Sequence, residues 1–306
     1  MVHQATGVVL MAYGGPERLE EIPAFLDDIL GKGWISDEHL EEITERYRAI
    51  GGGSPITAIT RRQAESLERL LADEGRPWPA AVGMRHSEPF ISEAVSSLVG
   101  KGCSRLVGLT VSPHTWTDAY RRALIEAADA LREPPEIVVV EEWHTNPSFL
   151  DAWADSLKEA WETVAVDERT RATLIFTAHS LPVSVAAGSP YEAQVHETIE
   201  GVMERVGPRP WRLAWQSQGI RGGEWLTPDI PETFASVAAD GYGTVVVVPV
   251  GFVADHVEVL YDLEIEARRL AEEAGLGFRR AASLNDSPPF IEALAGAILG
   301  VEESAP

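Results

Sequence analysis

The sequence predicts an α/β protein built from two similar, doubly wound domains, each with a parallel sheet flanked by helices. Three observations support this fold class: the length, the alternation of β-branched runs with helical stretches, and a likeness between the two halves of the chain. The 306 residues are about twice the length of a typical domain. Apolar residues make up 45% of the chain and charged residues 24%, a globular composition that excludes a disordered or fibrous protein.

Short runs rich in β-branched residues are the predicted strands. They cover residues 7–12, 80–84, 105–111 and 136–140 in the first half, and residues 173–178, 212–215, 244–250 and 277–281 in the second. Helical stretches separate these runs, which is typical of βαβ units on a parallel sheet.

The boundary between the halves is predicted from an amphipathic helix over residues 147–164 and the charged segment VDERTR that follows it, where we place the hinge. We therefore expect an N-terminal domain over residues 1–145 and a C-terminal domain over residues 146–286. A last helix is expected near residues 288–299. The sequence leaves open which half it packs against, and residues 287–306 are grouped with the first domain as one option.

The two halves begin alike. VVLMAYGGP contains Tyr13 and Pro16, and LIFTAHSLP contains His179 and Pro182, at a constant offset of 166 residues. Each half thus starts with a strand that delivers one polar side chain at its carboxyl end, where open parallel sheets bind ligands. Two such ends facing each other would form a cleft. The alternative is that the likeness is only the one that all βα units share.

The segment ADHVEVLYDLEIEARRL is the most informative in the chain. It follows an apolar strand and is predicted to be helical, which places Glu258, Asp262 and Glu266 at i, i+4 and i+8 on one face. Like charges at this spacing destabilise a helix by about a few tenths of a kcal/mol per pair. The ladder is therefore either a solvated face or a site that binds and passes cations. The neighbouring Asp255 and His256 favour the cation site.

A second chemical signal is AHSLP, which places His179 directly after a buried strand. Such a histidine is either a satisfied core or capping residue, or a proton acceptor or metal ligand. Its position at a strand terminus favours the second reading. An imidazole together with carboxylates suits a borderline ion such as ferrous iron, so His179 and Glu258 form a candidate pair.

The segment ERYRAIGGGSPITAITRRQ combines a basic pair with a glycine turn and a helix start. Ser54 is the predicted N-cap and Pro55 the first helical residue. With Arg46 upstream, this helix start is either a carboxylate or phosphate site or simply well capped. Its glycines match neither a P-loop nor a dinucleotide-binding motif.

Aromatic and imidazole side chains follow another strand of the first half, in VSPHTWTDAYRRA. His114, Trp116 and Tyr120 lie there, and such rings either face a flat apolar ligand or pack in the core. Cys103 is expected to be a small core side chain.

Charge and composition exclude several classes of function. The single cysteine, Cys103, excludes internal disulfides and any cluster or zinc site that needs several thiolates from this chain. A formal charge of −23 repels nucleic acid and anionic lipid. The longest uncharged stretch, residues 241–254, is too short and too interrupted by proline and glycine to span a bilayer. The opening residues run straight into a strand, so a cytoplasmic location is expected.

Four strings taken together resemble the ferrochelatase family in their order and spacing: YRAIGGGSPI, AHSLP, WQSQG and PVGFVADHVEVLYD. The resemblance extends from LMAYGGP to SPPFIEALA. It implies a chelatase-like fold of two Rossmann-like domains and the insertion of ferrous iron into a porphyrin. Fe²⁺ and the porphyrin are then substrates, and no cofactor is required. Some relatives hold an iron–sulfur cluster through four cysteines, which this chain cannot do.

The resemblance also implies roles for individual residues. His179 resembles the family's catalytic histidine, which as a neutral imidazole would accept pyrrole protons, with a pKa near or below the working pH. Glu258 resembles its partner carboxylate, which delivers metal or relays protons, and both flank the metal. Asp262 and Glu266 resemble an acidic track towards an outer cation site. Tyr13 resembles a tyrosine that contacts the product iron from the face opposite the histidine. The positions that resemble porphyrin contacts are Tyr13, Arg46, Tyr47, Ser54 and Tyr120.

The matching tyrosine and the lack of a predicted membrane anchor favour coproporphyrin III, and hence a lyase of haem biosynthesis. Leu30 stands where that branch often has an arginine for a propionate, and Lys32 is the nearby substitute. The alternatives are a protoporphyrin IX ferrochelatase, a chelatase of the same fold for another metal, or a non-catalytic porphyrin or haem carrier. The expected partners are coproporphyrin III and Fe²⁺, with transient contact to neighbouring haem-pathway enzymes, but neither nucleic acid nor a membrane. A monomer is favoured.

Overall fold

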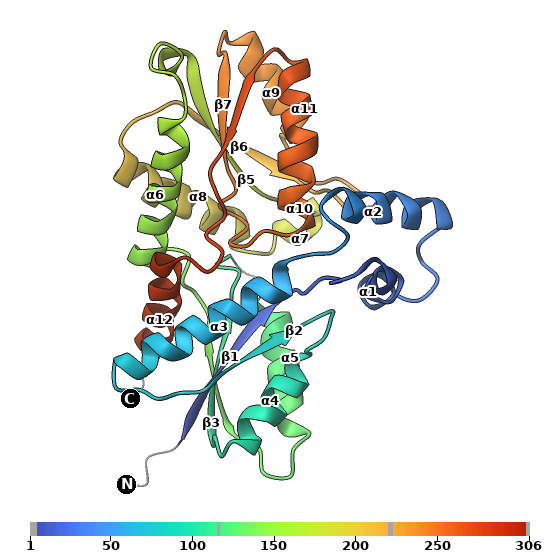
Figure 1. Ribbon diagram of the computed structural model, residues 1–306, viewed down its shortest axis with the longest axis vertical. Helices are drawn as coiled ribbons and strands as arrows, with labels where there is room; N and C mark the ends of the chain where they lie inside the picture. Colours follow the sequence, from blue (N-terminus) through green and yellow to red (C-terminus); the bar gives the residue numbers. More distant parts are fainter. Residues whose placement is uncertain (1–4, 115–116, 220–222, 304–306) are drawn as a thin grey trace. The chain divides into compact units, whose positions relative to one another are not determined.

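The computed structural model describes residues 5–114, 117–219 and 223–303. The chain forms two compact units (Figure 1). The first unit contains the chain up to residue 148 together with the chain from residue 285, and the second unit contains residues 149–284.

The first unit is built on a parallel four-stranded sheet with the order β2-β1-β3-β4. Its strands are β1 (Thr6–Ala12), β2 (Ala80–Met84), β3 (Arg105–Thr110) and β4 (Glu136–Val140). Its helices are η1 (Leu19–Glu21), α1 (Ile22–Leu30), α2 (Asp37–Ala49), α3 (Ile56–Asp73), α4 (Ile91–Gly100), α5 (Thr117–Asp129) and α12 (Pro288–Glu303). Every residue of β1 is buried, as expected for a central strand covered on both faces.

The second unit has a parallel four-stranded sheet with the order β6-β5-β7-β8. Its strands are β5 (Ala172–His179), β6 (Trp211–Gln216), β7 (Thr244–Val248) and β8 (Gly277–Arg280). Its helices are α6 (Pro147–Glu162), η2 (Arg169–Arg171), α7 (Val183–Ala186), α8 (Tyr191–Val206), α9 (Ile230–Ala239), α10 (Val257–Leu260), the π-helical turn η3 (Asp262–Ala267) and α11 (Arg268–Glu273).

The two sheets share one topology, which confirms the predicted fold class. In each unit the first strand lies between the second and the third, and the fourth strand follows at the edge. All of the predicted strands form, with small differences at their ends. β7 ends at Val248 because Pro249 has no N–H to donate to a neighbouring strand. His179 is the last residue of β5 and pairs with Gln216, so it belongs to the strand and does not follow it.

The last helix packs in the first unit, which answers the question that the sequence left open. α12 lies against α3 (Figure 1) and also against β4. The segment before it is held by two contacts from α3: Arg62 Nε donates to Asp286 over 2.9 Å, and Gln63 Nε2 donates to the carbonyl of Asn285 over 2.7 Å. Within the described part of the chain, no helix is both long and apolar enough to cross a bilayer.

The helix start at Ser54 differs by one residue from the prediction. α3 begins at Ile56, and Pro55 occupies the N-cap position in place of Ser54. Ser54 still contributes to the cap, because its Oγ accepts a hydrogen bond from the N–H of Ile56 at 3.4 Å. Proline carries no side-chain acceptor, so the serine before it supplies one.

Two residues that the sequence singled out lie in the core of the first unit. Cys103 is 4% exposed, as expected, and packs with the apolar side chains of β1, β3 and α4. His114 is 2% exposed and lies near His144, which is 5% exposed, with a distance of 6.3 Å between the ring centroids. Trp116 lies outside the described residues. Burial, aided by the charge that His144 could carry, lowers the pKa of His114 to about 3.

The neutral state of His114 makes the stability of the first unit sensitive to acid. Because the folded pKa lies below the unfolded value, the unfolded chain binds the extra proton first, and stability falls as the pH drops below about 6.5. Between pH 7 and pH 5 we expect His114 to account for a loss of about 2 kcal/mol in the free energy of unfolding.

Urea unfolding of wild type and His114→Gln at both pH values measures this effect. We expect the pH dependence to be weaker in His114→Gln, and to remain as in wild type when the exposed His39 is replaced by glutamine. An unchanged pH dependence in His114→Gln would show that this imidazole titrates normally in the folded state.

Candidate functional site

The carboxyl edge of the second sheet gathers the polar residues of the site. β5 ends at His179 and β6 ends at its register partner Gln216. β7 leads through residues 249–256 into α10, which carries Glu258. Parallel strands present their carboxyl ends at one edge of a sheet, so the topology itself brings these side chains together.

The Glu258 carboxylate lies between two imidazoles. Its Oε1 is 3.7 Å from Nε2 of His179, and its Oε2 is 3.7 Å from Nε2 of His256. The side chains of His179 and Glu258 remain 34% and 31% exposed, so a ligand can reach both groups. His256 is more enclosed at 18%. The ring of Phe252 stands beside both imidazoles, with centroid distances of 6.3 Å to His179 and 5.0 Å to His256.

Backbone carbonyls fix which nitrogen of each imidazole carries a proton. Nδ1 of His179 lies 2.5 Å from the carbonyl oxygen of Ser180, and Nδ1 of His256 lies 2.9 Å from that of Ala254. A carbonyl only accepts hydrogen bonds, so Nδ1–H is the donor in both rings. In the neutral form the basic nitrogen is therefore Nε2, which faces Glu258.

The three groups shift one another's protonation. Burial disfavours the charged form of both imidazoles, but the neighbouring carboxylate outweighs it and raises the pKa of His179 and of His256. Burial alone would raise the pKa of Glu258, whereas the two imidazoles hold that pKa well below its usual range. The sequence led us to expect that the pKa of His179 lies near or below the working pH. The pairing with Glu258 acts in the opposite direction, because it favours the imidazolium form.

The acidic ladder does not have the predicted spacing. α10 ends at Leu260, and the next turn, η3, is π-helical: the carbonyl of Tyr261 accepts from the N–H of Glu266 at 2.9 Å, five residues on. The prediction of an α-helical i, i+4, i+8 face is therefore wrong. Asp262 is 9% exposed and accepts a hydrogen bond from the Ser217 hydroxyl at 2.6 Å, while Glu266 is half-buried.

The segment WQSQG supports the site in a way that the sequence did not reveal. Gln216 is 3% exposed, and its Nε2 donates to the backbone carbonyl of Glu258 at 2.8 Å. Ser217 has a φ of 58°, in the left-handed region that costs most residues about 1 kcal/mol or more. This conformation accompanies the bond from its hydroxyl to Asp262. The sequence signal for this supporting role was a polar motif directly after a predicted strand. WQSQG was singled out only through the family resemblance.

In the first unit, Tyr13 follows β1 and is 45% exposed. Its ring lies 4.5 Å from that of His86 and 6.3 Å from that of Phe25. His86 is held in turn, since its Nδ1 lies 2.7 Å from an oxygen of Asp28 and its Nε2 accepts from Nε of Arg85 at 3.0 Å. The tyrosine is therefore an exposed ring that packs against His86 and Phe25.

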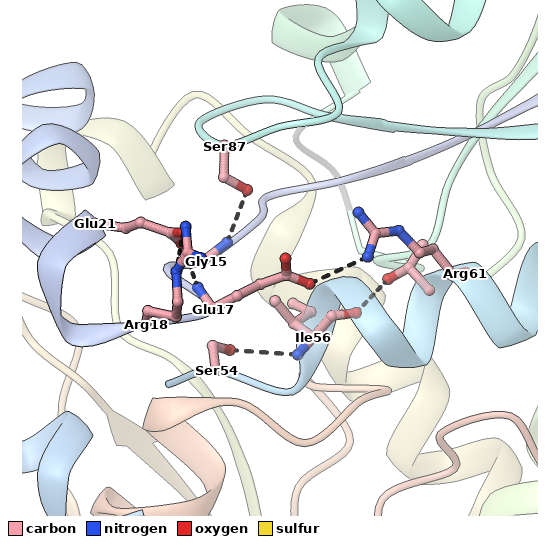
Figure 2. A network of polar contacts seen from close by, with 9 residues as sticks. Gly15, Glu17, Arg18, Glu21, Ser54, Ile56, Arg61 and Ser87 are labelled. Carbon is pink, nitrogen blue, oxygen red and sulfur yellow. Dashed lines mark hydrogen bonds and ion pairs between the residues drawn. The ribbon is translucent and has the colours of Figure 1, made fainter. Parts of the chain in front are cut away.

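The turn after β1 is held by polar contacts with side chains (Figure 2). The N–H of Gly15 donates to the Ser87 hydroxyl at 3.1 Å, and Nη1 of Arg61 donates to Oε1 of Glu17 at 3.3 Å (Figure 2). Gly14 has a φ of 90°, and a Cβ there would lie 2.3 Å from Oγ of Ser87. Glycine is thus required at position 14, and a Cβ on Gly15 would lie 2.9 Å from Cβ of Ser54.

The structure separates the other candidate residues by exposure. Arg46 is 35% exposed and pairs with Glu42 at 3.2 Å. Three more are buried: Tyr47 at 4%, Ser54 at 6% and Tyr120 at 6%. Burial raises the pKa of Tyr120, which packs in the core of the first unit. Over the described residues, no group of three or more His, Cys, Asp or Glu side chains forms a ready metal cage.

Comparison with known proteins identifies relatives across the whole chain. The ferrochelatase family model matches residues 5–300. A coproporphyrin III ferrochelatase of Geobacillus sp. (strain WCH70) is 38% identical over 307 residues, 98% of each chain. The coproporphyrin III ferrochelatase of Bacillus subtilis is 36% identical over 306 residues, also 98% of each. A ferrochelatase of Herpetosiphon aurantiacus is 34% identical over 300 residues, 96% of this chain and 98% of that one.

Solved structures with little sequence identity share the fold. SirB from Bacillus subtilis with Fe³⁺ aligns with a TM-score of 0.60 at 12% identity and covers 97% of both chains. CbiX, described as the terminal enzyme for siroheme biosynthesis in denitrifying bacteria, aligns with a TM-score of 0.52 at 14% identity over 96% of this chain and 98% of that one. These likenesses support the two Rossmann-like units.

The pairing of Glu258 with two imidazoles predicts a measurable shift. In Glu258→Gln we expect the pKa of both His179 and His256 to fall, because the carboxylate is lost while the burial that disfavours imidazolium remains. NMR titration of the imidazole resonances measures both values. Glu272→Gln, an exposed acid on α11, is the control and should leave them unchanged. Equal histidine pKa values in wild type and Glu258→Gln would contradict the pairing.

Proposed function

We propose that this chain, which belongs to the ferrochelatase family, is an enzyme that inserts ferrous iron into coproporphyrin III, a lyase reaction of haem biosynthesis. One observation carries the proposal at the level of chemistry: the Glu258 carboxylate lies between two imidazoles at an accessible sheet edge. Similarity to coproporphyrin III ferrochelatases over nearly the full length supports the choice of porphyrin.

Metal insertion must remove two protons from the free-base porphyrin. In the proposed mechanism, Nε2 of His179 accepts the two pyrrole protons one after the other, and each transfer requires that the imidazole has become neutral by passing the previous proton on. The raised pKa of His179 makes this nitrogen a stronger base but reduces its neutral fraction near neutral pH. Glu258 stabilises the imidazolium that forms and relays the proton or assists the incoming ion. His256, on the other carboxylate oxygen, is the next group along the relay.

Iron is a substrate here, and the four pyrrole nitrogens supply the ligands that His179 and Glu258 lack. A borderline ion such as Fe²⁺ suits this mixture of imidazole, carboxylate and pyrrole nitrogen. Tyr13 is proposed as a contact to the product iron, which its exposed hydroxyl-bearing ring supports. Asp262 and Glu266 are proposed as the outer cation track, with Asp262 held in place by Ser217.

Porphyrin contacts are proposed for the first unit. Of the candidates, Arg46 is the accessible cation and is the proposed partner of a propionate, with Lys32 as a second. Tyr47, Ser54 and Tyr120 are retained as proposed contacts, although each is largely buried. Local cations matter because a charge of −23 opposes a ligand with four carboxylates, and salt screens such distant repulsion beyond about 8–10 Å.

The remaining parts of the proposal concern the setting of the reaction. We propose a cytoplasmic enzyme that requires no cofactor or iron–sulfur cluster, with Fe²⁺ and coproporphyrin III as its partners. We also propose transient contact with neighbouring haem-pathway enzymes, because the metallated porphyrin must pass to the next enzyme.

Anaerobic steady-state assays with Fe²⁺, and with Co²⁺ and Ni²⁺ for comparison, test the substrates. We expect kcat/KM for coproporphyrin III to exceed that for protoporphyrin IX at least about tenfold, because vinyl groups in place of two propionates remove charge-assisted hydrogen bonds worth about 1.5–3 kcal/mol each. A preference for protoporphyrin IX, or for cobalt or nickel, would identify a different chelatase. Porphyrin binding without any metallated absorbance spectrum would identify a carrier.

Replacement of the proposed base tests the mechanism. His179→Ala should lower kcat for iron insertion by about 10²–10⁴-fold, the usual contribution of a positioned general base. Porphyrin affinity, measured by fluorescence quenching, should change little. His196→Ala, at an exposed histidine on α8, is the control and should behave as wild type. Turnover of His179→Ala at the wild-type rate would assign the base to another residue.

A further inference from the structure

A buried guanidinium lies beside the site without being part of the proposed chemistry. Arg280 is the last residue of β8 and pairs in register with Val247 of β7, the strand that leads to the loop before α10. Its side chain is only 10% exposed. Because β7 separates β8 from β5, Arg280 reaches the same sheet edge as His179 from the opposite side of β7.

The guanidinium contacts two acidic residues that are far apart along this segment. Nε donates to Oε1 of Glu264 in the π-helical turn at 2.5 Å. Nη2 lies 3.8 Å from Oδ1 of Asp255, an ion-pair distance. Nη1 donates to the carbonyl of Ala281 at 3.1 Å and to the Ser283 hydroxyl at 3.4 Å, which fixes the plane of the fork. Only arginine offers donors in such a rigid, divergent arrangement.

These two acids bracket the residues of the site. Asp255 immediately precedes His256, and Glu264 lies two residues beyond Asp262. A single cation therefore ties the end of the loop, at Asp255, to the π-helical turn, with Glu258 on α10 between the two attachment points. α10 spans only four residues and the helical period changes at η3, so the shape of this segment is not that of one regular α-helix.

We propose that Arg280 is a positioning residue, which joins Asp255 to Glu264 and thereby holds the Glu258 carboxylate between His179 and His256. This role rests on the proposed function for its effect on catalysis, but not for its effect on structure. A displacement of about 1 Å in a reacting group can cost up to about 10²-fold in rate, so a loose segment would be visible in kcat.

Arg268 provides a comparison within the same cluster. Its Nη2 donates to Oε2 of Glu264 at 2.5 Å, and its guanidinium lies over the ring of Phe278 at 4.7 Å. This is an i, i+4 pair along one helical segment, so it does not connect the turn to the loop at Asp255. Arg269, paired with Glu273, is a second and more exposed cation on α11. If Arg280 only added charge or stability, replacing these arginines would have similar effects.

The experiment compares Arg280→Gln and Arg280→Lys with Arg268→Gln and Arg269→Gln in the full-length protein. One measurement is steady-state iron insertion, which gives kcat and KM. The second is amide hydrogen exchange by mass spectrometry in the protein alone, followed in peptides from residues 255–267 and in peptides from β5. The exchange measurement needs neither substrate nor activity.

For Arg280→Gln we expect kcat to fall about tenfold or more, with KM for the porphyrin changed by less than about twofold. Exchange over residues 255–267 should quicken about tenfold, while β5 keeps its protection. Arg280→Lys should show most of the loss in kcat and most of the faster exchange seen in Arg280→Gln, because an ammonium keeps the charge but cannot span both acids. Arg268→Gln and Arg269→Gln should stay within about twofold of wild type in kcat.

Several results would overturn the proposal. Unchanged exchange over residues 255–267 in Arg280→Gln would show that Arg280 does not hold this segment in place. Faster exchange in β5 by the same factor would show general destabilisation instead of local positioning. Full activity in Arg280→Lys would reduce the role to one of charge. If the wild-type protein inserted no iron, the proposed function would fail. Faster exchange over residues 255–267 alone in Arg280→Gln would still establish the structural role of Arg280.

Discussion

The site depends on one constraint: a carboxylate kept ionised at the edge of a protein interior by two imidazoles. Removal from water alone would favour the neutral acid at Glu258, and it would favour neutral rings at His179 and His256. The mutual attraction of the three groups reverses both tendencies. Their protonation is therefore shared, and any change in one position or charge is felt by the other two.

The parallel sheet of the second unit makes this arrangement possible. β5 delivers His179, β6 delivers Gln216 beneath α10, and β7 leads into the loop that carries His256. Each side chain follows or ends a strand whose core residues are buried and whose register is fixed by backbone hydrogen bonds. The sheet thus fixes the backbone positions of these residues, and side-chain contacts fix the orientation of their polar groups.

The fold was predictable because strands that are buried on both faces have a composition of their own. Runs such as VVLMA and TVVVV leave little alternative to a central strand, and the repeated order of elements gave the two units. The pairing of His179 with Glu258 was predicted from their residue types and from the position of His179 at a strand terminus, and the resemblance added their roles. The partner role of His256 was not, because it arises from the path of a loop, which no periodicity encodes.

The acidic helix shows why local spacing was insufficient. Reading residues 258–266 with a period of 3.6 assumes an uninterrupted α-helix, but the turn that begins at Asp262 is π-helical, and Asp262 itself is buried. That turn is a local irregularity stabilised by groups remote in sequence: Ser217, in a left-handed conformation, holds Asp262, and Arg280 holds Glu264. Local rules fail here because long-range contacts set the backbone, and such failures are common where function constrains a fold. The spacing of the carboxylates is therefore a property of the assembled sheet edge and not of the helix sequence.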